Sequence, residues 1–271
     1  MREMPFMTHP VLVTGGTGTI GSRVVPLLVQ ADHDVRVLSR KPGTDRPQIQ
    51  YVAGNTVKGR GLTEALEGVS TVLHLAGGAK GDDVAAENLV EAARRARTEH
   101  LVLISVVGAD RMPIGYFRAK ARAEQTFERS GVPFSIVRVS QLHEFVLPVA
   151  KFLTRLPLAL APRGLRFEPV DVDAVAQRLT ELTLGRPAGR VADLAGPEVL
   201  DMRQILGQYL AAQGRSRRLV GTGIPGGVGR AYRAGENLAG PGVLRAGRTW
   251  EAFLFLPGDD SSSVRPQFRR A

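Results

Sequence analysis

Short runs of apolar, often β-branched residues alternate with longer amphipathic stretches along the first 140 residues. Strands are expected at residues 11–14, 34–38, 50–53, 69–75, 101–106 and 133–139, and helices at 18–30, 62–66, 84–97 and 116–129. This order is typical of βαβ units, whose right-handed crossovers place helices on both faces of a parallel sheet. The run 11–14 is apolar on both faces and is expected near the centre of the sheet. The pattern therefore predicts an α/β fold with a doubly wound parallel sheet.

Beyond Ser140 the alternation becomes looser. We expect helices near 145–156, 172–184, 202–213 and 250–256, strands near 165–170 and 191–194, and a glycine-rich segment at 221–229. The interpretation is a dinucleotide-binding core at residues 8–140, to which the strand near 191–194 returns. Residues 141–256 are then a smaller substrate-binding part, and residues 257–271, with two acids and three serines, a flexible tail.

Charge is spread unevenly along the 271 residues, which carry a formal net charge of +10. Residues 202–271 hold eleven arginines and four acids, whereas the first 201 residues hold 25 basic and 22 acidic side chains. Because only five of the 36 basic residues are lysines and no dense basic run occurs, we expect a solvated basic surface and no nucleic-acid partner.

Several classes of site and location are made improbable by composition. The chain has no cysteine, which excludes disulfides, thiolate metal sites and cysteine nucleophiles. Its five histidines lack metal-ligand spacing, so no metal site is expected. The start lacks a long apolar stretch, and the apolar region 145–162 is broken by Lys151, Arg155 and three prolines. We therefore expect a cytoplasmic protein without a membrane span, either a monomer or a homodimer.

A glycine-rich loop joins the first expected strand to the first expected helix. It reads Thr-Gly-Gly-Thr-Gly-Thr-Ile-Gly over residues 14–21. In such a loop the first glycine allows a tight turn, the second lets the backbone approach a pyrophosphate, and the third lets the helix pack on the strand. The anion would lie at the helix N-terminus, where free N–H groups favour negative charge. The candidate dinucleotide contacts are Gly15, Thr17, Gly18, Thr19, Ile20 and Gly21.

The turn after the second expected strand indicates which nicotinamide cofactor is used. An NAD site usually places an acid about 20 residues past the glycines, to hold the ribose 2'-hydroxyl. This chain has Ser39, Arg40 and Lys41 there instead. A guanidinium matches a phosphate with paired donors, so Arg40 is the first candidate for the 2'-phosphate, followed by Lys41 and Ser39. NADP is predicted over NAD, although an ordinary solvated turn is the alternative.

These motifs together resemble the short-chain dehydrogenase/reductase superfamily, in particular its extended and atypical branches with the NmrA-like proteins. The resemblance covers roughly residues 11–196 and is carried by the loop at 14–21 and by the segments 73–77, 88–93 and 116–120. It implies a Rossmann-type sheet of six or seven strands. It also implies that Ala76 and Gly77 lie beside the adenosine ribose, and that Asn55, which replaces the acid of the family's Gly-Asp-Leu, contacts adenine.

Tyr116 and Lys120 are the candidate catalytic pair, because a spacing of four places both on one helix face. About 0.07 Tyr-x-x-x-Lys pairs are expected by chance in this composition, and the pair lies where the superfamily keeps its own. A nearby ammonium lowers the pKa of a phenol, and the lysine can also hold the nicotinamide ribose. Tyr116 would then exchange a proton with the substrate oxygen. Ser105, at the end of a strand, is the candidate donor to the developing oxyanion.

Weaker candidates follow the sixth expected strand. Gln141 and His143 are expected to border the substrate, although a hydrogen-bonded loop histidine is equally plausible. Asn88 resembles an asparagine that completes a proton relay in some superfamily members.

The leading hypothesis is an NADP-dependent oxidoreductase. It would transfer hydride between the nicotinamide and a small hydrophobic carbonyl, quinone or enone, because the expected lining carries few charges. One alternative is an NmrA-like protein that senses the NADP redox state without turnover. The other is a sugar-nucleotide epimerase or dehydratase, which would share the glycine loop and the Tyr/Lys pair.

Overall fold

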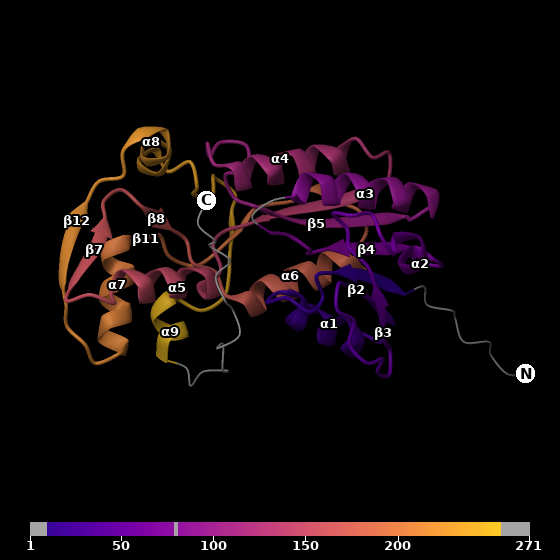
Figure 1. Cartoon of the computed structure of the whole chain (residues 1–271), viewed down its shortest axis with the longest axis horizontal. Helices are drawn as coiled ribbons and strands as arrows, with labels where there is room; N and C mark the ends of the chain where they lie inside the picture. Colours follow the sequence, from indigo (N-terminus) through magenta and orange to yellow (C-terminus); the bar gives the residue numbers. More distant parts are fainter. Residues whose placement is uncertain (1–9, 79–80, 256–271) are drawn as a thin grey trace, which may run out of the picture.

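The computed structural model describes residues 10–78 and 81–255, and its centre is a parallel sheet of nine strands (Figure 1). Along the sheet the order is β13-β10-β6-β5-β4-β1-β2-β3, and β9 also pairs with β6. The strands are β1 Val11–Thr14, β2 Val35–Ser39, β3 Ile49–Ala53, β4 Thr71–His74, β5 His100–Val106, β6 Phe134–Val139, β9 Gly189–Arg190, β10 Leu194–Ala195 and β13 Leu244–Arg245. The α/β prediction is confirmed. The sheet exceeds the expected six or seven strands because short strands after residue 188 extend the β6 edge.

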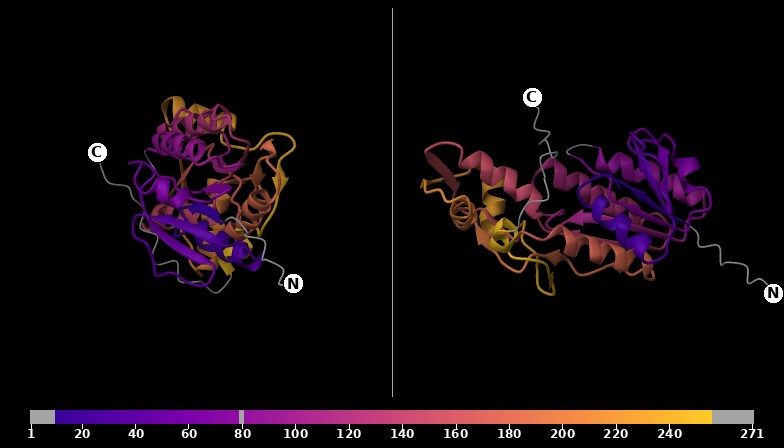
Figure 2. Two further views of the ribbon diagram at one scale, coloured as in Figure 1. Left: turned by 90° about the vertical axis from the view of Figure 1, so that its right-hand side faces the viewer. Right: turned by 90° about the horizontal axis from the view of Figure 1, so that it is seen from below.

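Helices cover both faces of the sheet, as its apolar strands require. On one face lie α1 Gly21–Gln30 and α6 Val172–Leu184, which pack with β1, β2, β5 and β6 (Figures 1 and 2). The other face carries α2 Leu62–Leu66, α3 Asp82–Arg95 and α4 Gly115–Glu128. Every residue of β5 is buried between the two layers. The sequence prediction placed α6 in the C-terminal part, but its buried side chains belong to the core of the sheet.

The C-terminal part is a separate small core beside the end of the sheet. It contains α5 His143–Leu153, β7 Leu158–Pro162, β8 Arg166–Phe167, β11 Leu200–Asp201, α7 Met202–Ala212, β12 Arg218–Thr222, α8 Gly226–Ala234 and α9 Trp250–Phe255. Strands β7 and β12 pair in parallel, and β8 pairs antiparallel with β11. Trp250 is buried at the centre of this core and donates from Nε1 to the carbonyl of Ile205.

Two features of this part were not expected from the sequence. The glycine-rich segment contains α8, and 158–162 pairs as a strand although it ends in proline. The expected tail at 257–271 and the first two residues of the expected core, 8 and 9, lie outside the described residues. Among the helices that the structure describes, none combines the length and apolar character needed to cross a membrane.

Candidate functional site

Packing within the glycine loop explains two of its glycines. Gly15 has a φ of +73°, and a Cβ there would lie 2.7 Å from the backbone nitrogen of Ala76. A Cβ on Gly21 would lie 2.3 Å from the carbonyl oxygen of Gly15. The loop closes on itself with a 3.0 Å hydrogen bond from the N–H of Gly18 to that same oxygen. Gly15 and Gly21 are therefore required by the turn itself, as the sequence pattern predicts.

Gly18 has no such internal requirement. It is exposed, its φ is not positive, and a Cβ would meet only the Gly15 oxygen, at 3.3 Å. Helix α1 starts just beyond it, and Ile20 at the N-cap supplies no side-chain cap. Thr17 is also exposed, and Thr19 is half-buried. The N-terminus of α1 has no side-chain cap, and the backbone next to it is exposed at Gly18. Such a helix N-terminus is suited to a phosphate, so this loop fits a dinucleotide.

The Ser39–Lys41 turn exposes two cations, Arg40 and Lys41. The Ser39 hydroxyl donates to the carbonyl of Lys41 at 2.9 Å and accepts from its N–H, so it shapes the turn. Arg40 is exposed, and within the described part of the chain its guanidinium forms no hydrogen bond or ion pair. Both cations stand where β2 ends, at the edge of the sheet that carries the glycine loop.

Asn55 and Asn88 are both engaged in local structure. The Asn55 side chain accepts from the N–H of Lys58 at 3.1 Å, within a turn closed by a bridge to Arg60. Asn88 donates from Nδ2 to the carbonyls of Thr56 and Val57 at 2.8 and 3.1 Å. The structure thus has Asn88 holding the loop after β3, and it is not joined to Lys120 in a relay.

The loop after β4 connects the glycine loop to the catalytic pair. The N–H of Ala76 donates to Thr14 Oγ1 at 3.2 Å, which joins the ends of β1 and β4. A Cβ on Gly77 would be 3.1 Å from Lys120 Nζ and 3.2 Å from Asp82 Oδ2. Residues 76 and 77 therefore lie between the two halves of the predicted site.

Lys120 is buried in an ion pair. Its Nζ lies 2.9 Å from Asp82 Oδ2, and both side chains are at most 8% exposed. The same Nζ lies 3.5 Å from the carbonyl oxygen of Ile104, and the N–H of Gly78 donates to Asp82 Oδ1 at 2.8 Å. His74 is also close: burial, and secondarily the charge of Lys120, lowers its pKa to about 3, and its Nδ1 is 2.7 Å from Thr14 Oγ1.

Tyr116 stands at the start of α4, one turn before Lys120, and keeps 36% of its surface exposed. Desolvation by the surrounding protein raises the pKa of its phenol, Lys120 lowers it, and Asp82 raises it. The net direction is upward. Lys120 acts on the phenol as expected from the sequence, but burial of the phenol, with a smaller contribution from Asp82, outweighs its effect.

Ser105 is buried near the end of β5, and no contact among the described residues joins it to Tyr116. Its Oγ is buried and forms no hydrogen bond with the described residues. It nevertheless lies near enough to Glu124 to lower the pKa of that carboxyl, together with Arg138 and against the effect of burial. The structure therefore directs the Ser105 hydroxyl toward Glu124 on α4.

His143 and Gln141 have different surroundings. The His143 side chain is fully buried and packs against Trp250 and Phe253, with ring centroids 5.7 and 4.7 Å apart. It lies in the small C-terminal core, and both of its buried ring nitrogens lack a hydrogen-bond partner among the described residues, so its contact with a substrate stays a prediction. Gln141 follows β6 and has a buried Oε1 without a hydrogen-bond partner. An unpaired buried acceptor suits a donor on a bound molecule.

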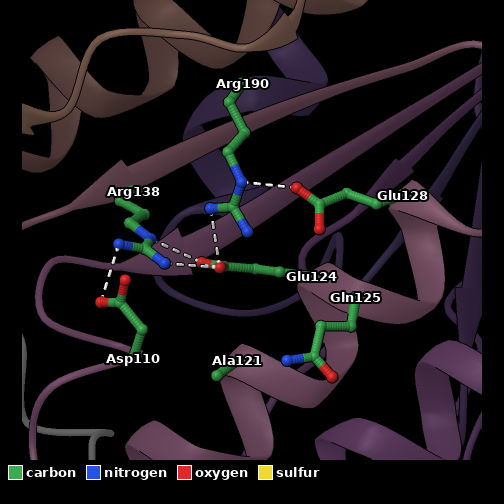
Figure 3. A pocket seen from close by; sticks show the side chains of 7 residues that line it. All are labelled: Asp110, Ala121, Glu124, Gln125, Glu128, Arg138 and Arg190. Carbon is green, nitrogen blue, oxygen red and sulfur yellow. Dashed lines mark hydrogen bonds and ion pairs between the residues drawn. The ribbon is translucent and has the colours of Figure 1, made fainter.

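A cavity of about 400 Å³ lies away from this site, beside α4, β6 and β9 (Figure 3). It is lined by Asp110, Ala121, Glu124, Gln125, Glu128, Arg138 and Arg190. Its charged side chains pair with one another: Arg138 with Glu124 and Asp110, and Arg190 with Glu124 and Glu128. This mutual pairing identifies a structural network that ties α4 to the sheet.

Sequence reasoning missed Asp82. The expected helix began at residue 84, whereas α3 begins at Asp82, after Gly81 with a φ of +88°. The pair Asp82-Asp83 directly after a glycine is a common helix start, and this signal could have drawn attention to both carboxylates.

Comparison with known proteins agrees with this geometry. Residues 15–148 match the family model described as NAD(P)H-binding. The NAD(P)H azoreductase of Xenophilus azovorans is 28% identical over 217 residues, which are 78% of this chain and 76% of that protein. Quinone oxidoreductase 2 of Escherichia coli is 22% identical over 220 residues, 76% of this chain and 75% of the relative.

Solved structures show the same fold. A nucleoside-diphosphate-sugar epimerase from Staphylococcus aureus has a TM-score of 0.73 at 17% identity, covering 91% of this chain and all of the other. The Escherichia coli NADPH-dependent quinone oxidoreductase, complexed with NADPH, has a TM-score of 0.69 at 19% identity and covers 79% and 78%. Residues 15–148 thus match an NAD(P)H-binding family model, and the chain shares the fold of these solved structures.

Proposed function

We propose that this protein is an NADPH-dependent reductase of small hydrophobic acceptors, namely quinones, enones, other carbonyl compounds or azo compounds. The observation that carries the proposal is that Tyr116 and Lys120 lie one helical turn apart on α4, with Lys120 Nζ beside Gly77 at the same sheet edge as the glycine loop. The similarity to an NAD(P)H azoreductase and to a quinone oxidoreductase supports a reductase and suggests the acceptor classes.

The proposed preference for NADPH rests on Arg40. Its guanidinium is exposed and unpaired within the described residues, and no carboxylate stands at the end of β2 to bind a ribose 2'-hydroxyl. Lys41 adds a second positive charge, while Ser39 shapes the turn that presents both. A guanidinium with all its donors free is the group best suited to a 2'-phosphate.

In this mechanism the glycine loop and the N-terminus of α1 bind the pyrophosphate, and Gly77, Lys120 and Gln141 border the nicotinamide end. The bound dinucleotide supplies the hydride. Tyr116 donates its phenolic proton to the acceptor oxygen or nitrogen as negative charge develops there. The carboxylate of Asp82 and the carbonyl of Ile104 fix the position of Lys120 Nζ below Gly77.

A hydrophobic acceptor is supported by the element that follows β6. Helix α5 begins three residues after Ser140 and exposes Phe145 and Val149, which are 56% and 41% exposed. Apolar side chains beside a few convergent polar groups are typical of sites for small apolar ligands.

The test is a titration of the purified protein with NADPH and NADH, followed by assays of NADPH oxidation with naphthoquinones, azo dyes, enones and aldehydes. Binding of NADPH with turnover of at least one acceptor supports the proposal. Binding without turnover of any acceptor favours a redox sensor, whereas NADH binding with conversion of a sugar nucleotide favours an epimerase.

A further inference from the structure

We infer that Asp82 is a positioning residue whose carboxylate compensates the charge of Lys120 and thereby favours the protonated, proton-donating form of Tyr116. The inference rests on the proposed function, in which Tyr116 is the proton donor. It concerns a carboxylate that the Tyr-x-x-x-Lys spacing does not contain.

Asp82 is positioned as the counter-ion of Lys120. Oδ2 lies 2.9 Å from Lys120 Nζ in a buried pair, and Oδ1 accepts from the N–H of Gly78 at 2.8 Å. One carboxylate therefore holds the lysine with one oxygen and the loop beneath the predicted nicotinamide site with the other. A Cβ on residue 77 would lie 3.1 Å from Lys120 Nζ and 3.2 Å from Asp82 Oδ2, so a glycine at this position leaves room for the ion pair.

Among the described residues, no other charge near the pair replaces Asp82. His74, a further titratable group beside Lys120, stays neutral at working pH because burial lowers its pKa to about 3. The neighbouring Asp83 turns outward and pairs at 2.7 Å with Arg122, whose side chain is 55% exposed. The groups that act on Tyr116 are thus Lys120 on its own helix and Asp82 from α3, with opposite signs.

The balance of these charges sets how readily Tyr116 gives up its proton. A lysine with an unopposed charge favours phenolate, which accepts a proton from an alcohol, whereas a lysine whose charge is compensated favours the phenol, which donates a proton. Burial raises the pKa of Tyr116, Lys120 opposes this shift, and Asp82 adds to it.

The test is an NMR titration of Tyr116 in the full chain labelled with 13C at the tyrosine ζ carbon. The chain has only four tyrosines, and the Tyr116→Phe variant assigns the signal. In Asp82→Asn, which keeps an acceptor for the Gly78 N–H but removes the charge, we expect the Tyr116 pKa to fall by about one unit. Asp82→Glu should restore it, and Asp83→Asn is the matched control with no expected change.

The double variant Asp82→Asn/Lys120→Met covers the case in which Asp82→Asn does not fold, because it leaves neither member of the pair buried without its partner. If Asp82 compensates the charge of Lys120, the Tyr116 pKa of the double variant should stay close to that of wild type. An unchanged or raised Tyr116 pKa in Asp82→Asn, or a Tyr116 pKa in the double variant clearly above that of wild type, overturns the inference. The NMR titration needs no turnover, so its outcome is independent of the NADPH oxidation assays that test the proposed function.

Discussion

Arg138 on β6 holds the buried carboxylate of Glu124 on α4 with two hydrogen bonds, of 2.8 Å from Nε to Oε1 and 2.7 Å from Nη2 to Oε2 (Figure 3). Arg190 of β9 adds an ion pair of 2.8 Å to the same Oε2. Glu124 is 1% exposed, so its charge is separated from water and depends on these partners. The helix that carries Tyr116 and Lys120 is thus joined to two strands by one carboxylate.

Replacing Glu124 with glutamine should therefore destabilise the protein without affecting nucleotide binding. The substitution removes the Glu124 carboxylate charge with which the half-buried Arg138 guanidinium pairs. Breaking a buried ion pair by removing one partner costs about 3–5 kcal/mol. Urea unfolding measures this. Glu128→Gln is the control, because Glu128 is exposed and pairs only with Arg190 among the described residues, and exposed pairs contribute less than about 1 kcal/mol. Equal losses in both variants would contradict the account.

Gly18 and Gly21 should respond oppositely to substitution by alanine. Gly18→Ala should weaken NADPH binding by about tenfold or more while leaving the melting temperature nearly unchanged, because the new methyl group faces the dinucleotide and meets little protein. In Gly21→Ala the methyl group would lie 2.3 Å from the Gly15 oxygen, so the loop must distort and the melting temperature should fall. Calorimetry and NADPH fluorescence separate the two effects. A large loss of stability in Gly18→Ala would show that its glycine serves packing.

Arg40→Ala tests the cofactor preference. We expect the dissociation constant for NADPH to rise about tenfold or more, as for loss of a charge-assisted contact, with little change for NADH. Arg46→Ala is a matched control, since Arg46 is an exposed arginine in the chain segment between β2 and β3. Equal weakening of both cofactors would remove Arg40 from the 2'-phosphate site.

His143 should make stability depend on pH. Burial lowers its pKa to about 4, with Asp171 opposing and Arg248 reinforcing this shift. As the pH falls, the unfolded chain therefore takes up a proton on His143 at a higher pH than the folded chain does. The free energy of unfolding is highest above pH 6.5 and falls as the pH falls toward 4, by up to about 1.4 kcal/mol per pH unit. In His143→Phe, which keeps an aromatic ring against Trp250, the free energy of unfolding should fall less steeply over this range. Identical slopes for both proteins would contradict the assignment.

Much of the N-terminal half could be predicted because its signals are local. A strand, a glycine loop and a helix follow one another within 20 residues, and such a loop predicts where a dinucleotide binds. The surroundings of the His143 side chain could not be predicted, because its neighbours Trp250 and Phe253 come from a helix more than 100 residues away in the sequence. Asp82 was missed for a related reason: its pairing with Lys120 depends on the packing of α3 against α4, which periodicity does not reveal.

The most direct test of the central claim compares wild type and Tyr116→Phe in NADPH oxidation with a naphthoquinone or azo acceptor that the wild type turns over, at saturating NADPH. The account predicts that kcat falls by about a hundredfold or more, as expected for loss of a general acid, while the dissociation constant for NADPH stays unchanged. An unchanged kcat in Tyr116→Phe would contradict the assignment of Tyr116 as the proton donor.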